Sequence, residues 1–169
     1  AVSTGASDDA LKLKLRVEAL FLRAFCHFEL YRYYSNSAVP TDLAMAYMET
    51  PSLSPTVRIT VGPYFVKLKA DLAEAKTLLP GNLTDVFRAN KLVVSGLQAR
   101  VALYLKEYGD ANTYSTEYIA GLPLSPRAEF TGIWTDANKN ESAFILARTT
   151  ATSRMGSLFR GTSASASNI

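Results

Sequence analysis

Apolar residues recur at helical spacing from Asp8 to about Tyr34, a stretch without proline or glycine, and this pattern predicts one long helix. One apolar row comprises Leu13, Val17, Leu20, Ala24, Phe28 and Tyr31. A second row, on another side of the same helix, comprises Leu15, Ala19, Leu22, Cys26 and Leu30. The polar residues left between the rows are Lys12, Arg16, Arg23 and His27. Because this polar stripe is narrow, we expect other parts of the protein to cover the helix on most of its sides.

The next stretch, from Ser35 to Ile59, contains several prolines among polar residues and predicts an ordered but irregular connection. A second helix is predicted after it, because Thr60 can cap a helix and Pro63 is tolerated in a first turn. Pro80 and Gly81 are expected to stop this helix. Its apolar stripe consists of Val61, Phe65, Leu68, Leu72, Ala75 and Leu79. This is the most regular helical pattern in the chain.

Two more helices are predicted after Asn90, which can cap the first of them, while Gly109 is expected to end it. The large residues of this third helix are Val93, Leu97, Val101, Tyr104 and Tyr108. Its small residues, suited to close packing, are Ser95, Ala99 and Ala102. Asp110 is expected to cap a fourth helix that ends before Gly121. The side chains that this fourth helix is expected to bury are Tyr114 and Tyr118. The short loop between the two predicts an antiparallel helix pair.

Beyond Gly121 the periodic signals weaken, and the sequence LPLSP predicts a linker rich in turns. Trp134 is predicted to lie in a polar loop, and the stretch from Ser142 to Arg148 predicts one short strand. A single strand cannot form a sheet alone, so we expect its partner in sequence outside this chain. The last residues, 149–169, are rich in Ser, Thr, Gly and Ala and are predicted to be loop or poorly ordered.

The composition is that of a globular protein, with 48% hydrophobic and 20% charged residues. A single domain over 1–169 is the expected organisation. The net charge of +3 comes from Lys and Arg scattered among Asp and Glu, so we expect no nucleic-acid partner. No apolar stretch approaches the length required to cross a bilayer. The opening AVSTGASDD does not have the pattern of a signal segment, and we interpret both ends as truncations of a longer protein.

Chemistry of catalysis or metal binding is not predicted by this sequence. Cys26 and His27 are the only cysteine and histidine, and they point to different sides of the first helix without a third group to orient them. We interpret His27 as a structural residue and Cys26 as a small buried thiol. The spacing of metal ligands and the glycine-rich loop of a phosphate site are both missing from the sequence. We therefore expect no metal, no cofactor and no enzymatic activity.

Aromatic residues are the candidates for ligand binding, because sugar faces stack on exposed Trp and Tyr rings. Most of the tyrosines fall in the predicted helical stripes, where packing is the favoured interpretation. Trp134 differs, since it lies among Thr, Asp and Asn residues. It is the single best candidate for a ligand-binding residue. Anchoring of its loop to the core is nevertheless the favoured role for Trp134, ahead of a ligand platform.

Three long motifs, in the expected order, resemble the RagB/SusD family. The first is EALFLRAFCHFELYRYYSNSAVP, from Glu18 to Pro40, and it is the most specific. The second is RITVGPYFVKLKADLAEAKTLLP, from Arg58 to Pro80, and the third is RANKLVVSGLQARVALYLKEYGDA, from Arg88 to Ala111. ESAFILA, from Glu141 to Ala147, then resembles a strand of the family. The resemblance covers roughly residues 15 to 148.

The resemblance implies a mainly α fold, made of antiparallel helix pairs of tetratricopeptide-like type with long irregular loops and at most a short strand. It also implies a bacterial lipoprotein at the cell surface, held to the outer membrane only by an N-terminal lipid anchor that would precede Ala1. The implied partners are an oligosaccharide ligand and a SusC-like TonB-dependent transporter. Family members are usually much longer than this chain, so none of their ligand-binding residues is carried over to a position here.

The leading hypothesis for function is capture of glycans for import, without bond cleavage. A peptide ligand is the nearest alternative. A second class is a tetratricopeptide-like module that binds another protein in a concave groove. An enzyme would require catalytic groups in sequence outside this chain.

Overall fold

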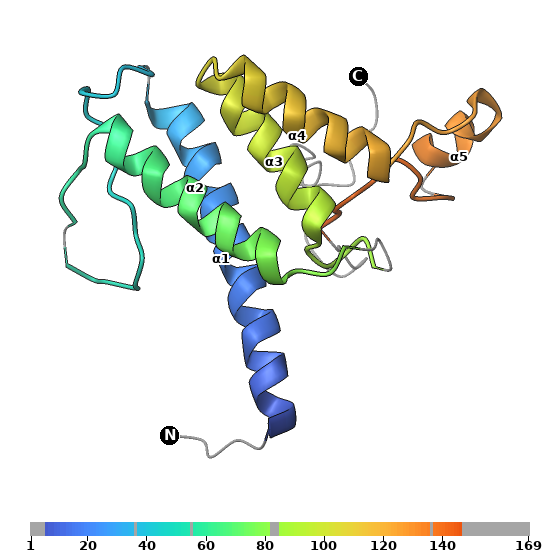
Figure 1. Cartoon of the computed structure of the whole chain (residues 1–169), viewed down its shortest axis with the longest axis horizontal. Helices are drawn as coiled ribbons and strands as arrows, with labels where there is room; N and C mark the ends of the chain where they lie inside the picture. The colour runs from blue at the N-terminus through green and yellow to red at the C-terminus, as the bar shows by residue number, and fades with distance from the viewer. Residues whose placement is uncertain (1–5, 36, 55, 82–84, 136, 147–169) are drawn as a thin grey trace, which may run out of the picture.

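Helices dominate the described structure, as the sequence predicts (Figure 1). The computed structural model describes residues 6–35, 37–54, 56–81, 85–135 and 137–146. Its elements are α1 (Ala6–Tyr34), α2 (Val61–Leu78), α3 (Lys91–Tyr104), α4 (Tyr108–Gly121), the 3-10 turn η1 (Arg127–Glu129) and α5 (Phe130–Trp134). Within these ranges strand pairing is limited to one isolated antiparallel bridge between Leu43 and Thr60. The mainly α fold class is therefore confirmed.

The four long helices form two antiparallel pairs, α1 with α2 and α3 with α4, and α2 packs against α3 (Figure 1). This arrangement agrees with the predicted tetratricopeptide-like helix pairs. The irregular connection predicted between the first two helices is also present, and it loops out beside α2. The N-terminal part of α1 extends beyond the other helices in Figure 1.

The core between α1, α2 and α3 is built around aromatic rings. The Tyr31 ring lies 5.3 Å from the ring of Tyr64, 4.7 Å from Phe65 and 5.9 Å from Tyr104, measured between centroids. Apolar side chains of the predicted stripes complete the core and include Val17, Phe28, Leu68, Leu72, Leu97 and Val101. Because aromatic rings bury large areas and prefer these tilted contacts, they contribute strongly to the packing of the three helices.

The expectation that α1 is covered on most sides is wrong for the described residues. The first apolar row is buried from Val17 to Tyr31, but Leu13 near the protruding end is 44% exposed. The second row is exposed along its length, and its members are Leu15, Ala19, Leu22, Cys26 and Leu30. Because α2 and α3 pack on one face of α1, the thiol of Cys26 lies outside the core, contrary to the sequence prediction.

The predicted start of α3 is confirmed, but its predicted end is not. The Asn90 side chain accepts hydrogen bonds from the backbone N–H groups of Leu92 (3.0 Å) and Val93 (3.1 Å). At the other end, Lys106 adopts the left-handed conformation, with φ of 63°. The N–H of Glu107 donates to the Ala102 carbonyl at 2.8 Å, which closes the helix in a Schellman motif.

Sequence inspection placed this stop at Gly109, because glycine is the usual residue at the left-handed position. Tyr108 therefore opens α4 and is 65% exposed, instead of continuing the stripe of α3. The sequence placed Asp110 at the N-cap of α4, but Glu107 occupies that position and Asp110 lies in the first turn. Tyr114 and Tyr118 are half-buried, so α4 buries less than the sequence predicted.

The predicted strand from Ser142 to Arg148 is not a strand over its described residues, 142–146. Its backbone makes single contacts instead: the N–H of Ile145 donates to the Val86 carbonyl at 2.7 Å, and the Ala143 carbonyl accepts from the Asn90 side chain at 3.2 Å. The segment thus supports the start of α3. Residues 147–169, including the predicted C-terminal loop, lie outside the described residues.

Leu97→Ala is expected to lower the free energy of unfolding by about 2 to 5 kcal/mol, because it removes a large side chain from a packed core. Leu97 is 4% exposed, whereas Leu103 on the same helix is 60% exposed and provides a matched control. Urea titration should show a loss below about 0.5 kcal/mol for Leu103→Ala. Equal effects of the two substitutions would contradict the packing described above.

Candidate functional site

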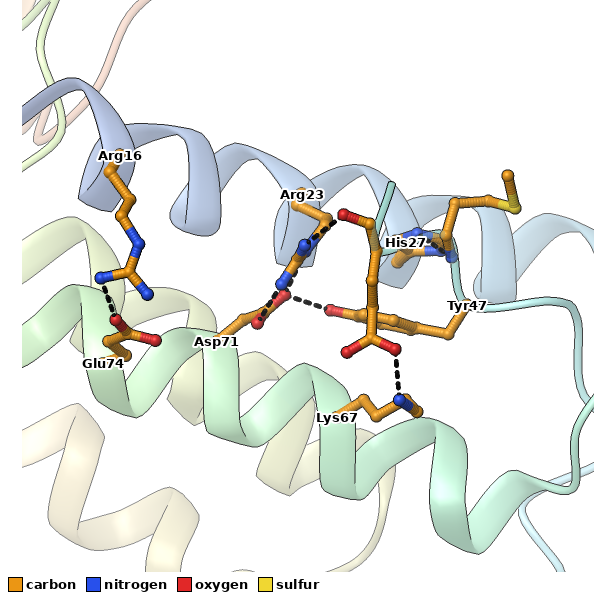
Figure 2. Close-up of polar contacts among 9 residues, drawn as sticks. Arg16, Arg23, His27, Tyr47, Lys67, Asp71 and Glu74 are labelled. Carbon is orange, nitrogen blue, oxygen red and sulfur yellow. Dashed lines mark hydrogen bonds and ion pairs between the residues drawn. The ribbon is translucent and has the colours of Figure 1, made fainter. Parts of the chain in front are cut away.

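The polar stripe of α1 faces α2 and the irregular connection, as Figure 2 shows. Arg16 forms an ion pair with Glu74 at 2.5 Å. Further along the same two helices, Arg23 forms an ion pair with Asp71. The next member along the stripe, His27, is 6% exposed and lies beneath the connection. Arg23 and His27, in the second half of the stripe, are therefore interface residues, whereas the side chains of Lys12 and Arg16 are more than half exposed.

The Arg23–Asp71 pair is the centre of this polar network (Figure 2). Nε and one Nη atom of Arg23 each donate to a different carboxylate oxygen of Asp71, both at 2.6 Å. The Tyr47 hydroxyl donates to the same carboxylate at 2.6 Å, and the remaining Nη of Arg23 donates to the Glu49 carbonyl at 3.0 Å. Only 10% of the Asp71 side chain is exposed, so its charge is satisfied mainly by these donors.

The network shifts the pKa values of Arg23 and Tyr47 in the directions that keep both side chains protonated. The hydrogen bonds that Arg23 donates to Asp71 raise the pKa of Arg23, which stays charged. Burial, followed by the neighbouring Asp71 carboxylate, raises the pKa of Tyr47 far above its usual range, which keeps its hydroxyl a donor. The network therefore links α1, α2 and the connection through fully formed charge-assisted hydrogen bonds.

His27 ties the connection to the helices with a defined tautomer. Its Nε2 accepts a hydrogen bond from the backbone N–H of Met48 at 3.1 Å, so the proton of the neutral ring is on Nδ1. Nδ1 lies 3.1 Å from the Tyr64 hydroxyl, which itself donates to the His27 carbonyl at 2.8 Å. The imidazole also stacks on the Tyr47 ring at 4.1 Å between centroids.

Both ring nitrogens of His27 are occupied, and burial lowers its pKa below the usual value. Such a histidine holds structure, as the sequence analysis proposed, and is not placed to exchange protons with a ligand. Clusters of three or more His, Cys, Asp or Glu that could hold a metal ion are absent from the described ranges.

Trp134, the sequence-based candidate for ligand binding, ends the short helix α5 and is 76% exposed. Its neighbour Phe130 is 59% exposed, and the two ring centroids lie 6.2 Å apart at an interplanar angle of 70°. Backbone contacts hold the turn after α5, where the N–H of Asn138 donates to the Gly132 carbonyl at 3.1 Å. In the described structure Trp134 does not anchor a loop to the core.

A groove of about 780 Å³ lies between α1, α3, α4 and the segment 141–146. Its rings come from Phe21, Phe25, Tyr118 and Phe144, while Arg100 and Glu141 are its charged residues. Sequence inspection missed this groove, because Phe25 belongs to neither apolar row of α1. The available signal was a glycine, Gly96, inside a helical pattern. The structure gives its reason, because a Cβ at this position would lie 3.0 Å from the Tyr118 ring.

Comparison with known families identifies the class to which the chain belongs. Residues 2–103, more than half of the chain, match the SusD-like family described as "Starch-binding associating with outer membrane". The chain is therefore a member of the SusD-like family, which confirms the resemblance drawn from its three long motifs. A search of curated proteins gives no match.

Solved structures agree with this assignment. A SusD superfamily protein from Bacteroides thetaiotaomicron VPI-5482 is 25% identical, with a TM-score of 0.75 over 87% of this chain and 34% of that one. A SusD superfamily protein from Bacteroides vulgatus ATCC 8482 is 22% identical, with a TM-score of 0.71 over 88% of this chain and 36% of that one. A SusD-like carbohydrate binding protein from the same organism is 23% identical, with a TM-score of 0.63 over 78% of this chain and 29% of that one.

The chain thus spans about a third of the length of these solved structures. The likenesses below 25% identity support the fold alone. Within the described ranges, no helix combines the length and apolarity required to span a membrane.

Asp71→Asn is expected to lower the free energy of unfolding by about 2 to 3 kcal/mol, because it leaves the largely buried Arg23 charge without its counter-ion. Glu74→Gln removes the partner of Arg16, whose side chain is 58% exposed, and is the matched control between the same two helices, with an expected loss below about 1 kcal/mol. Urea titration measures both. A loss for Asp71→Asn no larger than for Glu74→Gln would show that the network does not hold the helices together.

Acidification is expected to destabilise the protein through His27. Its folded pKa lies below the usual 6.5, so the unfolded chain takes up the proton first, and stability falls as the pH drops below about 6.5. Above that pH the neutral ring of His27 makes its full contribution to the free energy of unfolding. His27→Gln should reduce the loss of unfolding free energy between about pH 7 and pH 5 relative to the unsubstituted chain. An identical pH dependence in both chains would exclude His27 as its source.

Proposed function

We propose that this chain is part of a cell-surface protein that captures oligosaccharides for import, with Trp134 and Phe130 as a platform for the sugar. The observation that carries the proposal is the exposed aromatic pair on α5, in a chain of the SusD-like family. Aromatic faces match the apolar faces of sugar rings and lose little rotamer entropy on binding. The turn at Gly132 and Asn138 supports the helix that presents the two rings.

The proposed role is binding without bond cleavage. The buried His27 has both nitrogens engaged, and the Asp71 carboxylate is bound by three donor groups. Neither group is arranged as a general acid or base toward an exposed ligand. The protein would hand its ligand to a SusC-like TonB-dependent transporter, and a lipid anchor preceding Ala1 would hold it at the outer membrane.

The helices of this chain would contribute to docking with the transporter more than to ligand capture. The support for this division is the exposed second row of α1, where Leu15, Leu22 and Leu30 present apolar side chains at 49%, 42% and 41% exposure. Exposed apolar surface of this kind is typical of protein interfaces. It also keeps open the alternative of a tetratricopeptide-like interaction module, and a peptide ligand remains the alternative to a glycan.

Trp134→Ala is expected to weaken oligosaccharide binding by the full-length protein about fivefold or more, because stacking on one ring contributes on the order of 1 kcal/mol. Tyr33→Ala is the matched control, since Tyr33 on α1 is also 76% exposed. Calorimetry measures the affinities, and melting temperatures should stay unchanged. Equal affinities of the two variants would remove Trp134 from the ligand site, and release of shorter sugars over time would refute the non-enzymatic role.

A further inference from the structure

The groove between α1, α3, α4 and the segment 141–146 exposes apolar side chains along its walls. Ile119 on α4 is 62% exposed and Leu146 is 67% exposed, and both line the groove. The small residues Gly96 and Ala99 on α3 leave room for a large side chain to enter it. Apolar surface gathered around a hollow is typical of a docking site for another apolar segment.

The described chain ends at this groove. Leu146 is both its last described residue and a lining residue, so the sequence that follows begins there. Residues 147–154 are mostly polar, and an extended residue covers about 3.3 Å, so this stretch is long enough to turn back onto the groove. A segment tethered in this way acts at a roughly millimolar effective concentration, above that of a second copy of the chain in dilute solution.

The sequence after Leu146 contains one cluster of large apolar residues, formed by Met155, Leu158 and Phe159. Their i, i+3, i+4 spacing is that of anchor residues which one helical turn presents to a groove. Three arginines and no acidic residue occur in 147–169, so this sequence is positively charged.

The charges at the groove are complementary to that sequence. Arg100 is paired with Glu29 at 3.0 Å, which offsets the one positive charge of the lining. Glu141 accepts a hydrogen bond from the backbone N–H of Ser125 at 2.7 Å, but it has no ion pair with any described residue. The carboxylate of Glu141 therefore favours a positively charged occupant.

We propose that residues 155–159 of this chain dock in the groove. Their three large apolar side chains contact the rings of Phe25, Tyr118 and Phe144, which are only half-buried by the described residues. Docking removes these rings from water, and a neighbouring arginine pairs with Glu141. The inference concerns a different surface from the aromatic pair on α5 and does not depend on the proposed sugar site.

The docked segment also holds 141–146 against α3. The N–H of Ile145 donates to the Val86 carbonyl at 2.7 Å, at the edge of the same segment. Because a backbone hydrogen bond exchanges when its segment opens locally, protection of the Ile145 N–H should depend on the docked residues.

The test is NMR spectroscopy of the 169-residue chain at low concentration. Nuclear Overhauser contacts should join the Leu158 methyl groups to the ring protons of Tyr118. Phe159→Asp should remove these contacts and speed hydrogen exchange of the Ile145 N–H at least about tenfold, because a charged side chain is not accepted by an apolar groove. Ser163→Asp introduces the same charge nearby in the sequence and is the matched control, which should change neither observation.

A second variant approaches the groove from its α3 wall. Ala99→Asp places a charge inside the groove and should also remove the Leu158 contacts. Ala120→Asp, at an exposed position of α4 that does not line the groove, should leave them in place. Phe159→Asp changes no residue of the helices, so it decides the question if Ala99→Asp does not fold.

Absence of the Leu158 contacts in the unsubstituted chain would overturn the proposal, and so would contacts that survive Phe159→Asp. Contacts seen only between differently labelled copies of the chain would assign the groove to a second copy and would overturn it too. Failure here is distinct from failure of the proposed function, because sugar binding through Trp134 is measured on its own.

Discussion

The bidentate pair between Arg23 and Asp71 is the contact on which the arrangement of α1, α2 and the irregular connection depends. Removing two charges from water is unfavourable unless nearly every donor and acceptor is engaged, and here Tyr47 and the Glu49 carbonyl complete the set. These hydrogen bonds form only in certain orientations, whereas burial of apolar side chains in the core has no preferred direction. Of the ways in which two apolar helices can pack, it therefore favours the one that brings these four groups together.

The same network gives order to a connection that has almost no regular secondary structure. Its backbone groups need partners, and side chains of α1 supply them: His27 accepts from the Met48 N–H, and Arg23 donates to the Glu49 carbonyl. This proline-rich loop is thereby held against a helix pair, and its described residues show strand pairing only at the single bridge between Leu43 and Thr60. In a binding protein this rigidity matters, because ordered loops lose less conformational entropy when a ligand or partner arrives.

The proposed binding surfaces and the scaffold lie in different parts of the chain. The aromatic rings of Tyr31, Tyr64 and Phe65 are buried in the core, and those of Phe130 and Trp134 stand on a short helix in solvent. The exposed row of α1 provides a third surface, which is apolar. Under the proposed function, side chains that pack the core would thus be separate from those that contact ligand or partner.

The sequence alone determined the helices, because the 3.6-residue repeat of apolar side chains and the cap at Asn90 are local signals. It also carried the family motifs, whereas the sequence favoured a Trp134 anchored to the core, and only the structure shows this side chain 76% exposed. The sequence did not predict the end of α3, because Lys106 adopts the left-handed conformation that glycine usually adopts. Tertiary structure decided which face of α1 is buried, that its polar stripe meets Asp71 and Tyr47, and that Phe25 borders a groove. These outcomes depend on residues distant in sequence, whose approach is set by packing and not by local periodicity.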